Sequence, residues 1–499
     1  MSDPTPTVPH FINGETQMGE AARFAPVYNP ATGQVTHRVP LGSGGVGAAV
    51  AAARAAYPAW RATPLARRTA ILFQIRDRLA SHQQEIARII TAQHGKVLAD
   101  AMGEVARGLE NVEFACGIPQ LLKGEYSEQA STDVDVYSIR QPLGVVVGVS
   151  PFNFPAMVPL WMMANGIACG NTFVLKPSEK DPSASVLIAQ LMTEAGLPPG
   201  VLNVVQGDRE AVEALVGHPD VAAVSVVGST PVARAIRRAA VAADKRVQAL
   251  GGAKNHLVVL ADADLGAAAD GAVSAAYGSA GERCMAVSVV VAVEEVADEL
   301  VAAITQRMAA LVIGDGMDPA SDMGPLVTRE HRDRVAGYVE SAQREGAALV
   351  VDGRSAPVTS SPGFFLGATL LDHVTPEMAC YRDEIFGPVL SVVRVASADD
   401  ALQLVNDNPW GNGVALYTRD GGAARRFQFE VLCGMVGINV PIPVPVGYHS
   451  FGGWKASLFG ETHMYGPDSV NFYTRRKVVT SRWPSATPAG VDLRFPGAP

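Results

Sequence analysis

Short valine-rich runs alternate with helical patterns from residue 144 onward. The apolar runs read GVVVGVS, TFVLK, VLNVV, VAAVSVV and RVQAL, and helical periodicity begins between them near residues 156, 182, 209 and 231. Continuous apolar runs of this length are typical of parallel strands that are covered on both faces. The pattern predicts repeated β-α-β units and therefore a doubly wound parallel sheet.

A second α/β pattern starts after residue 250. It contains the runs NHLVVL, AVSVVVAV, GPVLSVVRV and VGINV, with a helix expected over 295–311. Ala-rich helical patterns over 46–58 and 67–122 precede the first sheet. The chain is therefore predicted to be an α/β protein with two bodies, each built around its own sheet.

Two segments alternate polar residues with valine and tyrosine. They are SEQASTDVDVYSIRQPLG and SVNFYTRRKVV, and the second lies close to the end of the chain. Such alternation predicts extended strands with one face in solvent. We expect residues 128–140 and 469–480 to pair as an arm beyond the globular body, followed by a loose tail.

Length, composition and charge narrow the classes of partner. A chain of 499 residues is too long for one core and predicts roughly three units. Charged residues make up 18% and the formal net charge is −9, which argues against a nucleic-acid or anionic-membrane binder. The expected partner is a small molecule.

The stretch 142–175 contains no charged residue, so a membrane-spanning segment has to be considered. It is interrupted by Pro151, Pro155 and Pro159 and by three asparagines, which would leave polar groups unsatisfied in lipid. A buried strand, loop and helix of a soluble core is the better interpretation.

The cysteine pattern indicates a reducing compartment. The five cysteines are far apart, odd in number and include no CxxC pair, which argues against a disulfide framework or a zinc site. The first residues show neither a secretory nor a transit pattern. We therefore expect a cytoplasmic protein without a bound metal.

Two glycine-containing segments are candidates for nucleotide binding. GSGGVG contains a literal GxGxxG at Gly42, Gly44 and Gly47, but the following segment lacks the acidic residue that the fingerprint requires, so an ordinary turn is preferred. In VVGSTPVAR, Ser229 precedes a helix start that suits a pyrophosphate, with an ordinary N-cap as the alternative.

The segment TFVLKPSEKDP is a stronger cofactor candidate. A strand delivers Lys176 and Glu179 at its carboxyl end, where open α/β sheets bind ligands. Glu179 could accept ribose hydroxyls and would repel a 2′-phosphate, which favours NAD over NADP. The alternative for this motif alone is a solvated charged turn.

One cysteine has surroundings suited to catalysis. Cys284 follows Arg283 and a helix rich in small residues, whereas the other four cysteines read as small hydrophobic residues. Asn153 lies between two aromatics and two prolines in SPFNFPAMVPLW, a costly place to bury an unpaired amide. Asn153 is therefore a candidate for half of an oxyanion hole beside a Cys284 thiolate.

The ordered motifs PFNFP, KPSE, GST, LGG, GERC and EIFGPV resemble the NAD(P)-dependent aldehyde dehydrogenase superfamily. The resemblance implies an NAD-binding domain of Rossmann type over 1–127 and 142–248, and an α/β catalytic domain over 249–462. It implies an oligomerisation ribbon over 128–141 and 463–483, with a tail over 484–499. It also implies Cys284 as nucleophile and Asn153 as oxyanion donor. The implied cofactor residues are Phe152, Lys176, Glu179, Lys180, Ser229 and Glu384.

One position departs from the hydrolytic members of the superfamily. These carry a water-activating glutamate immediately before LGG, where this chain has Ala249. A thiol needs less activation than water, since it is already a few per cent thiolate near neutrality, so coenzyme A is a suitable second nucleophile. The segments LGGAKNH, GERCMA and GLENVEFACG resemble the CoA-acylating methylmalonate-semialdehyde dehydrogenases. That resemblance implies that Arg107 and Arg283 recognise a substrate carboxylate.

The expected reaction is oxidation of methylmalonate or malonate semialdehyde to a Cys284 thioester, loss of carbon dioxide, and transfer of a propionyl or acetyl group to coenzyme A. A homo-oligomer, dimer or tetramer, is expected. The first alternative is a hydrolytic aldehyde dehydrogenase in which another group, such as Glu282, activates water. The second is an NAD-binding scaffold without activity, against which the intact Cys284 and Asn153 argue. Residues 441–459 differ from the sequence that is usual in this family before the terminal ribbon. This altered segment is expected to line the substrate entrance.

Overall fold

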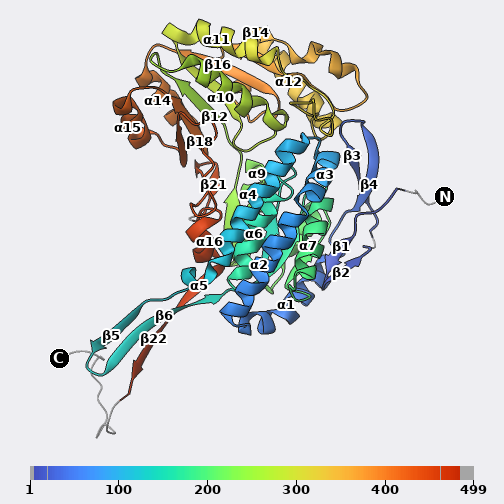
Figure 1. Cartoon of the computed structure of the whole chain (residues 1–499), viewed down its shortest axis with the longest axis vertical. Coiled ribbons are helices and arrows are strands. Elements are labelled where there is room, and N and C mark those ends of the chain that lie inside the picture. The colour runs from blue at the N-terminus through green and yellow to red at the C-terminus, as the bar shows by residue number, and fades with distance from the viewer. Residues whose placement is uncertain (1–4, 20, 461, 484–499) are drawn as a thin grey trace.

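Two α/β bodies and a three-stranded arm make up the molecule (Figure 1). The computed structural model describes residues 5–19, 21–460 and 462–483. Each body is built on a mainly parallel sheet, which confirms the fold class predicted from the alternation of apolar runs and helical stretches. The tail predicted over 484–499 lies outside the described residues.

The first body contains an eight-stranded sheet in the order β2-β1-β9-β8-β7-β10-β11-β21. Its five inner strands from β9 to β11 are parallel, while β1, β2 and β21 add antiparallel edges. The strand order reverses between β7 and β10, and loops at such a reversal bind ligands. The strands are β1 (His10–Ile12), β2 (Glu15–Gln17), β7 (Val145–Val149), β8 (Thr172–Lys176), β9 (Leu202–Val204), β10 (Val221–Val227), β11 (Arg246–Leu250) and β21 (Leu458–Phe459).

Helices cover both faces of this sheet. Successive residues of β7 point to opposite faces, so that Val146 packs with α2, α3, α4, α6 and α7, while Val147 packs with α1, α8 and α9. The helices are α1 (Val46–Ala62), α2 (Leu65–Ser81), α3 (Gln83–His94), α4 (Leu98–Cys116), α5 (Ile118–Leu121), α6 (Met157–Ala168), α7 (Ser183–Glu194), α8 (Arg209–Gly217) and α9 (Thr230–Ala242).

The uncharged stretch 142–175 forms the centre of this body. Every residue of β7, α6 and β8 is buried, in agreement with the predicted strand, loop and helix of a protein core. Within the described part of the chain, no helix combines the length and apolar character needed to cross a lipid bilayer.

The second body contains a seven-stranded sheet in the order β14-β15-β16-β13-β12-β18-β19, parallel except for the edge pair β14 and β15. The strands are β12 (Asn255–Val259), β13 (Val287–Val293), β14 (Ala348–Val351), β15 (Thr369–Asp372), β16 (Val389–Val395), β18 (Gly413–Tyr417) and β19 (Met435–Ile438). The helices are α10 (Leu265–Tyr277), α11 (Glu294–Met308), α12 (Arg329–Glu345), α13 (Ala379–Arg382), α14 (Ala398–Asp407) and α15 (Gly421–Glu430), with short 3-10 turns η1 (Gly278–Gly281), η2 (Gly353–Ser355) and η3 (Pro357–Ser360).

The arm consists of β5 (Tyr126–Ser131), β6 (Val134–Pro142) and β22 (Thr474–Arg482), and it projects from the first body (Figure 1). Strand β22 pairs antiparallel with β6 from Thr474↔Pro142 to Arg482↔Val134. The predicted pairing of two distant segments is therefore present, but residues 466–473 form helix α16 (Gly466–Tyr473) rather than strand. A proline in the first turn and a buried face explain that helix.

One small hairpin and one short antiparallel strand pair complete the fold. Strand β3 (Phe24–Asn29) pairs with β4 (Gln34–Pro40), and β17 (Trp410–Gly411) pairs with β20 (Trp454–Lys455). The GxGxxG sequence lies in the turn between β4 and α1, where the Gly42 N–H donates to Asp208 at 3.1 Å. Strand β4 belongs to a hairpin outside both large sheets, so this turn does not follow a strand of the first sheet as the dinucleotide-binding fingerprint requires.

Candidate active site

Cys284 lies in the short connection between η1 and β13. Its carbonyl oxygen accepts hydrogen bonds from the side-chain amides of Asn255 at 2.9 Å and Asn412 at 3.1 Å. Of the five unpaired cysteines, Cys284 is half-buried and the other four are buried. The thiol with the greatest access is therefore the one that the sequence singled out.

The backbone before Cys284 is strained. Ser279, Ala280 and Gly281 have φ values of 53°, 51° and 74°, in the left-handed region that non-glycine residues rarely adopt. A Cβ at Gly281 would lie 2.3 Å from the carbonyl oxygen of Gly387. Such strain persists only where surrounding contacts enforce it, and it is common at functional sites.

The free Cys284 thiol is strongly protonated. Burial raises its pKa to about 12, the Glu384 carboxylate contributes to the rise, and the Arg283 cation opposes it with a smaller effect. A cavity of about 20 Å³ is lined by Cys284, Arg283 and Glu384, among others. The Arg283 cation alone therefore does not lower the pKa of Cys284 enough to produce a thiolate at neutral pH.

Asn153 follows β7 on the switch-point side of the first sheet. It is 3% exposed, and its side-chain amide has no hydrogen-bond partner within residues 5–19, 21–460 and 462–483. Its carbonyl oxygen accepts from Lys96 Nζ at 2.6 Å. An amide held in place through its backbone, with free donors, suits an oxyanion hole.

Lys96 and Glu104 hold this turn and were not identified from the sequence. Lys96 Nζ donates to Glu104 Oε2 at 2.8 Å, and both side chains are fully buried. Glu104 Oε1 accepts from the N–H groups of Ala156 and Met157 at the start of α6. One signal was present in the sequence: Glu104 lies on the apolar face of α4 with Ala101 and Val105.

The expected cofactor residues lie at the carboxyl edge of the first sheet. Lys176 Nζ donates to Gly207 O at 2.9 Å and to Glu179 at 3.3 Å. Ser229 precedes α9, which begins without a side-chain cap. These three residues and the free N–H groups of α9 lie where a dinucleotide would approach the sheet.

Two further cofactor candidates come from different bodies: Glu384 lies between α13 and β16 of the second body, and Lys180 follows β8 of the first. Glu384 Oε1 accepts from the Ala253 N–H at 2.9 Å, and burial raises its pKa. Lys180 Nζ lies 4.4 Å from the centre of the Phe152 ring in a cation–π contact. Lys180 therefore faces Phe152 rather than sharing the Lys176 hydrogen bonds.

The position of the missing acid is apolar. Ala249 is fully buried in β11, where it pairs with Val226 and Phe459 and packs into the apolar cluster that also contains Val149. Glu282 does not replace the acid at this position, because its side chain is fully buried and faces His94, His331 and Val327. Burial raises the pKa of Glu282 to about 8.

Both candidate substrate arginines already have protein partners. Arg107 Nη1 donates to both carboxylate oxygens of Glu110 at 2.9 Å, and Nη2 donates to the carbonyl oxygens of Val444 and Pro445. Arg283 Nη2 donates to Asp100 at 2.7 Å. The guanidinium groups are therefore oriented before any substrate arrives.

Tyr465 connects the Arg107 region to the nucleophile. Its hydroxyl donates to Pro445 O at 2.8 Å, and its ring packs against Trp161 and Phe451. Burial raises the pKa of Tyr465; the Arg107 charge opposes the rise and a Cys284 charge would add to it. The charges of Arg107 and Cys284 therefore both influence Tyr465. The altered segment 441–459 borders these residues.

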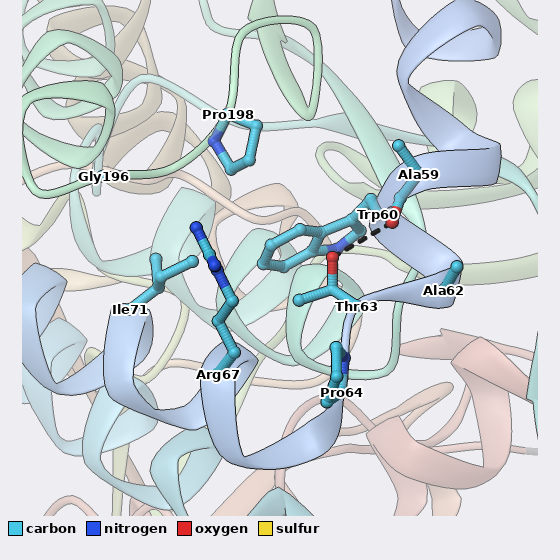
Figure 2. A pocket seen from close by; sticks show the side chains of 9 residues that line it. All are labelled: Ala59, Trp60, Ala62, Thr63, Pro64, Arg67, Ile71, Gly196 and Pro198. Atoms are coloured by element: carbon cyan, nitrogen blue, oxygen red, sulfur yellow. Dashed lines mark hydrogen bonds between the residues drawn. The ribbon is translucent and has the colours of Figure 1, made fainter.

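A separate hollow of about 370 Å³ lies between the end of α1, the start of α2 and the loop at 196–198 (Figure 2). Trp60 and Ile71 form its walls, and Arg67 extends between them toward Pro198. None of the nine lining residues is a candidate catalytic or cofactor residue. The hollow is therefore distinct from the site at Cys284.

Comparison with known proteins identifies the family of this chain. The model of the aldehyde dehydrogenase family matches residues 17–479. A malonate-semialdehyde dehydrogenase of Pseudomonas aeruginosa is 56% identical over 494 residues, covering 98% of this chain and 99% of the relative. The crystal structure of a methylmalonate-semialdehyde dehydrogenase from Oceanimonas doudoroffii has a TM-score of 0.95 at 55% identity, covering 97% of this chain and 99% of that chain.

A Sinorhizobium meliloti structure complexed with NAD also has a TM-score of 0.95, at 50% identity, over 97% of this chain and 99% of that chain. The family match spans the second sheet, the first sheet apart from its edge strands β1 and β2, and most of the arm, and its range includes Cys284, Asn153 and the residues at the carboxyl edge of the first sheet. The chain belongs to the aldehyde dehydrogenase family, as its ordered motifs indicate.

Proposed function

We propose that this chain oxidises methylmalonate or malonate semialdehyde with NAD and transfers the resulting acyl group, after loss of carbon dioxide, to coenzyme A. One observation carries the proposal: Cys284 and Asn153 are retained, while position 249 is a buried alanine without a water-activating group. The substrate class is supported by the names of the Pseudomonas and Oceanimonas relatives.

The residues at the first sheet fit NAD. The first N–H groups of α9 lack a side-chain cap and suit a pyrophosphate, while Lys176 and Glu179 suit the adenosine ribose. Glu384, close to Cys284, suits the nicotinamide ribose. When bound, NAD accepts the hydride that leaves the substrate carbon.

Thioester formation uses Cys284 and Asn153. The thiol loses its proton to solvent, and the sulfur attacks the aldehyde carbon while the carbonyl π electrons move to oxygen. The free N–H groups of the Asn153 amide donate to this oxyanion. Collapse of the oxyanion expels the hydride and leaves the acyl group bound to Cys284 as a thioester.

Decarboxylation follows from the position of the substrate carboxylate. The carboxylate lies β to the thioester carbonyl, so the bond to it can break with its electron pair forming an enolate. Asn153 stabilises the enolate oxygen as it did the first oxyanion. Carbon dioxide leaves, and a proton adds to the α carbon to give a propionyl or acetyl thioester.

Coenzyme A completes the cycle. Its thiolate attacks the thioester carbonyl, the new carbon–sulfur bond forms, and the bond to Cys284 breaks. No general base is needed at position 249. A thiol is already partly ionised to thiolate near neutral pH, whereas water would need a base to remove its proton. The products are propionyl-CoA or acetyl-CoA and a free Cys284.

Arg107 and Arg283 are proposed to recognise the substrate carboxylate. A guanidinium has five N–H donors. The bond to Asp100 leaves Arg283 four of them, whereas the bonds to Glu110, Val444 and Pro445 leave Arg107 its Nε–H. Paired hydrogen bonds to a planar carboxylate provide geometric selectivity. The protein carboxylates hold each arginine in position for this contact.

The arm of β5, β6 and β22 is proposed as the oligomerisation contact of a homodimer or homotetramer. Val478 is 65% exposed on β22 and Tyr126 is 64% exposed on β5, so apolar side chains face outward. A cytoplasmic location is proposed as well, since all five cysteines are unpaired thiols. Light scattering of the purified protein tests the assembly, and a monomer would reject it.

The test of the reaction is turnover of methylmalonate semialdehyde with NAD, with and without coenzyme A, and identification of the product by mass. Propionyl-CoA formed only when coenzyme A is present supports the proposal. Free acid formed at the same rate without coenzyme A would reject it and favour the hydrolytic alternative.

A further inference from the structure

A fully buried carboxylate lies directly behind the nucleophile segment. Glu282, two residues before Cys284, is 0% exposed. Its Oε1 accepts from the Val327 N–H at 3.4 Å and lies 3.4 Å from His331 Nε2. Within the described part of the chain, its Oε2 has no hydrogen-bond partner, and it lies 3.8 Å from His94 Nε2, which also has none there.

The hydrogen-bond partners of His331 define where its hydrogen lies. Arg334 Nη2 lies 2.9 Å from His331 Nδ1, and a guanidinium can only donate, so Nδ1 is the acceptor. The hydrogen is therefore on Nε2, which donates to Phe386 O at 2.6 Å. Phe386 has a φ of 59°, and this hydrogen bond helps to hold its left-handed backbone.

His94 makes the corresponding contact on the other side. Its Nδ1 accepts from the Lys96 N–H at 3.3 Å, which leaves Nε2 directed at Glu282. Its ring stacks on Phe152 at 5.9 Å and 25°. Phe152 in turn contacts the edges of Phe386 at 5.8 Å and of His331 at 6.5 Å.

These contacts connect the three segments that carry the proposed chemistry. Glu282 belongs to the Cys284 segment, Phe152 adjoins the oxyanion donor Asn153, and Phe386 follows Glu384 by two residues. Buried polar atoms without partners are costly, so ordinary packing does not account for a carboxylate and two imidazoles at this junction. An apolar trio would fill the same space at lower cost.

We propose that Glu282, His94 and His331 form a buried clasp that fixes Cys284 relative to Asn153 and Phe386, so that Glu282 is a positioning residue for thioester formation. The inference rests on the proposed role of Cys284. It assigns Glu282 no contact with substrate and no proton transfer, which separates it from the base considered in the hydrolytic alternative.

The test measures the burst of NADH in a single turnover without coenzyme A. The burst amplitude counts correctly folded sites, whereas its rate constant reports the geometry of the attacking sulfur and the oxyanion donor. Glu282→Ala is expected to lower the rate constant about 10- to 100-fold with the amplitude preserved, because misplacing reacting groups by about 1 Å has effects of this size. Glu282→Gln, which keeps the shape and one acceptor oxygen, is expected to recover most of the rate.

Three outcomes would overturn the clasp: a wild-type rate constant in Glu282→Ala, a loss confined to the amplitude, or Glu282→Gln as slow as Glu282→Ala, which would indicate proton transfer. If Glu282→Ala does not fold, His331→Ala at the margin of the clasp provides the same test, with a rate loss expected and a wild-type rate overturning the inference. His10→Gln removes a buried histidine that binds Gln206 N–H elsewhere and is the matched control, expected to keep the wild-type rate.

The wild-type measurement separates the two proposals. Absence of an NADH burst in the wild-type protein would reject the proposed function and the clasp with it. A normal, CoA-releasable burst in the wild type, combined with any of the three contrary outcomes in the variants, would reject the clasp alone.

Discussion

The Arg283 guanidinium donates a 2.7 Å hydrogen bond to Oδ1 of Asp100, a residue 183 positions earlier in the chain. Both side chains are less than one-fifth exposed. Burial alone would raise the pKa of Asp100, but the charges of Arg283 and Lys96 hold it below its usual value. The start of α4 thus supplies the anion that orients Arg283 beside Cys284.

Loss of Arg283 should weaken carboxylated substrates selectively. Arg283→Ala is expected to lower kcat/KM for methylmalonate semialdehyde about 10- to 100-fold, because a charge-assisted pair is lost. For propionaldehyde, which has no carboxylate, the value should change little. Steady-state kinetics with both aldehydes provide the measurement, and Arg344→Ala, at an exposed end of α12, is the control. An unchanged ratio between the aldehydes would contradict carboxylate recognition.

The free enzyme should react slowly with thiol reagents at neutral pH. Because burial raises the pKa of Cys284 to about 12, the thiol is protonated over the neutral range and its thiolate fraction grows as pH rises. The rate of alkylation by iodoacetamide should therefore increase about tenfold per pH unit up to pH 10 without a plateau. Cys284→Ala should abolish both labelling and NADH production. A plateau near pH 8 would disagree with this assignment.

A carboxylate restored at position 249 should change the second nucleophile. Ala249→Glu is expected to give NADH turnover without coenzyme A, since a base would then be available to water. It should also reduce stability by about 1–3 kcal/mol, because the site is apolar. Ala249→Gln is the matched control, equally destabilised but still dependent on coenzyme A. Equal CoA-independent turnover in both variants would show that the new carboxylate is not the base.

Replacing one partner of the buried Lys96–Glu104 ion pair, which supports Asn153, should destabilise the protein more than replacing both partners. Lys96→Met leaves the buried Glu104 unpaired and is expected to reduce the free energy of unfolding by about 3–5 kcal/mol. Adding Glu104→Gln should restore part of that loss, because no uncompensated charge remains. Urea unfolding of the single and double variants measures both steps. Additive losses in the double variant would argue against direct coupling of these two residues.

His256 should make the protein acid-sensitive. Burial lowers its pKa to about 3, so below pH 6.5 the unfolded chain binds a proton that the folded chain does not. Stability is therefore present above pH 6.5 and is lost as pH falls toward 3, by about 2 kcal/mol between pH 7 and pH 5 for this group. In His256→Gln the loss over that interval should be smaller by this amount, whereas the exposed His449→Gln should behave as the wild type. Urea unfolding at the two pH values gives the comparison.

Local patterns were sufficient for the sheets and singled out Cys284 as a candidate nucleophile. The runs TFVLK and RVQAL coincide with β8 and β11, because continuous apolar stretches between helices have few alternatives to buried parallel strands. The helix over residues 466–473 was not predicted from the sequence. The alternation that predicted a strand also fits a short helix, and the burial of such a helix is decided by its neighbours. The single half-buried cysteine was identifiable from Arg283 and the small residues before it.

The sequence by itself determined the α/β architecture, the paired arm, the candidate pair Cys284 and Asn153, and the absence of an acid before LGG. These depend on residue type, periodicity and order along the chain, which act locally. Only the tertiary structure decided that Arg283 meets Asp100, that Lys96 supports Asn153, and that Glu282 faces His94 and His331 rather than solvent. The physical reason is that partners of buried charges lie on different elements, and no local preference specifies which distant side chain will satisfy them.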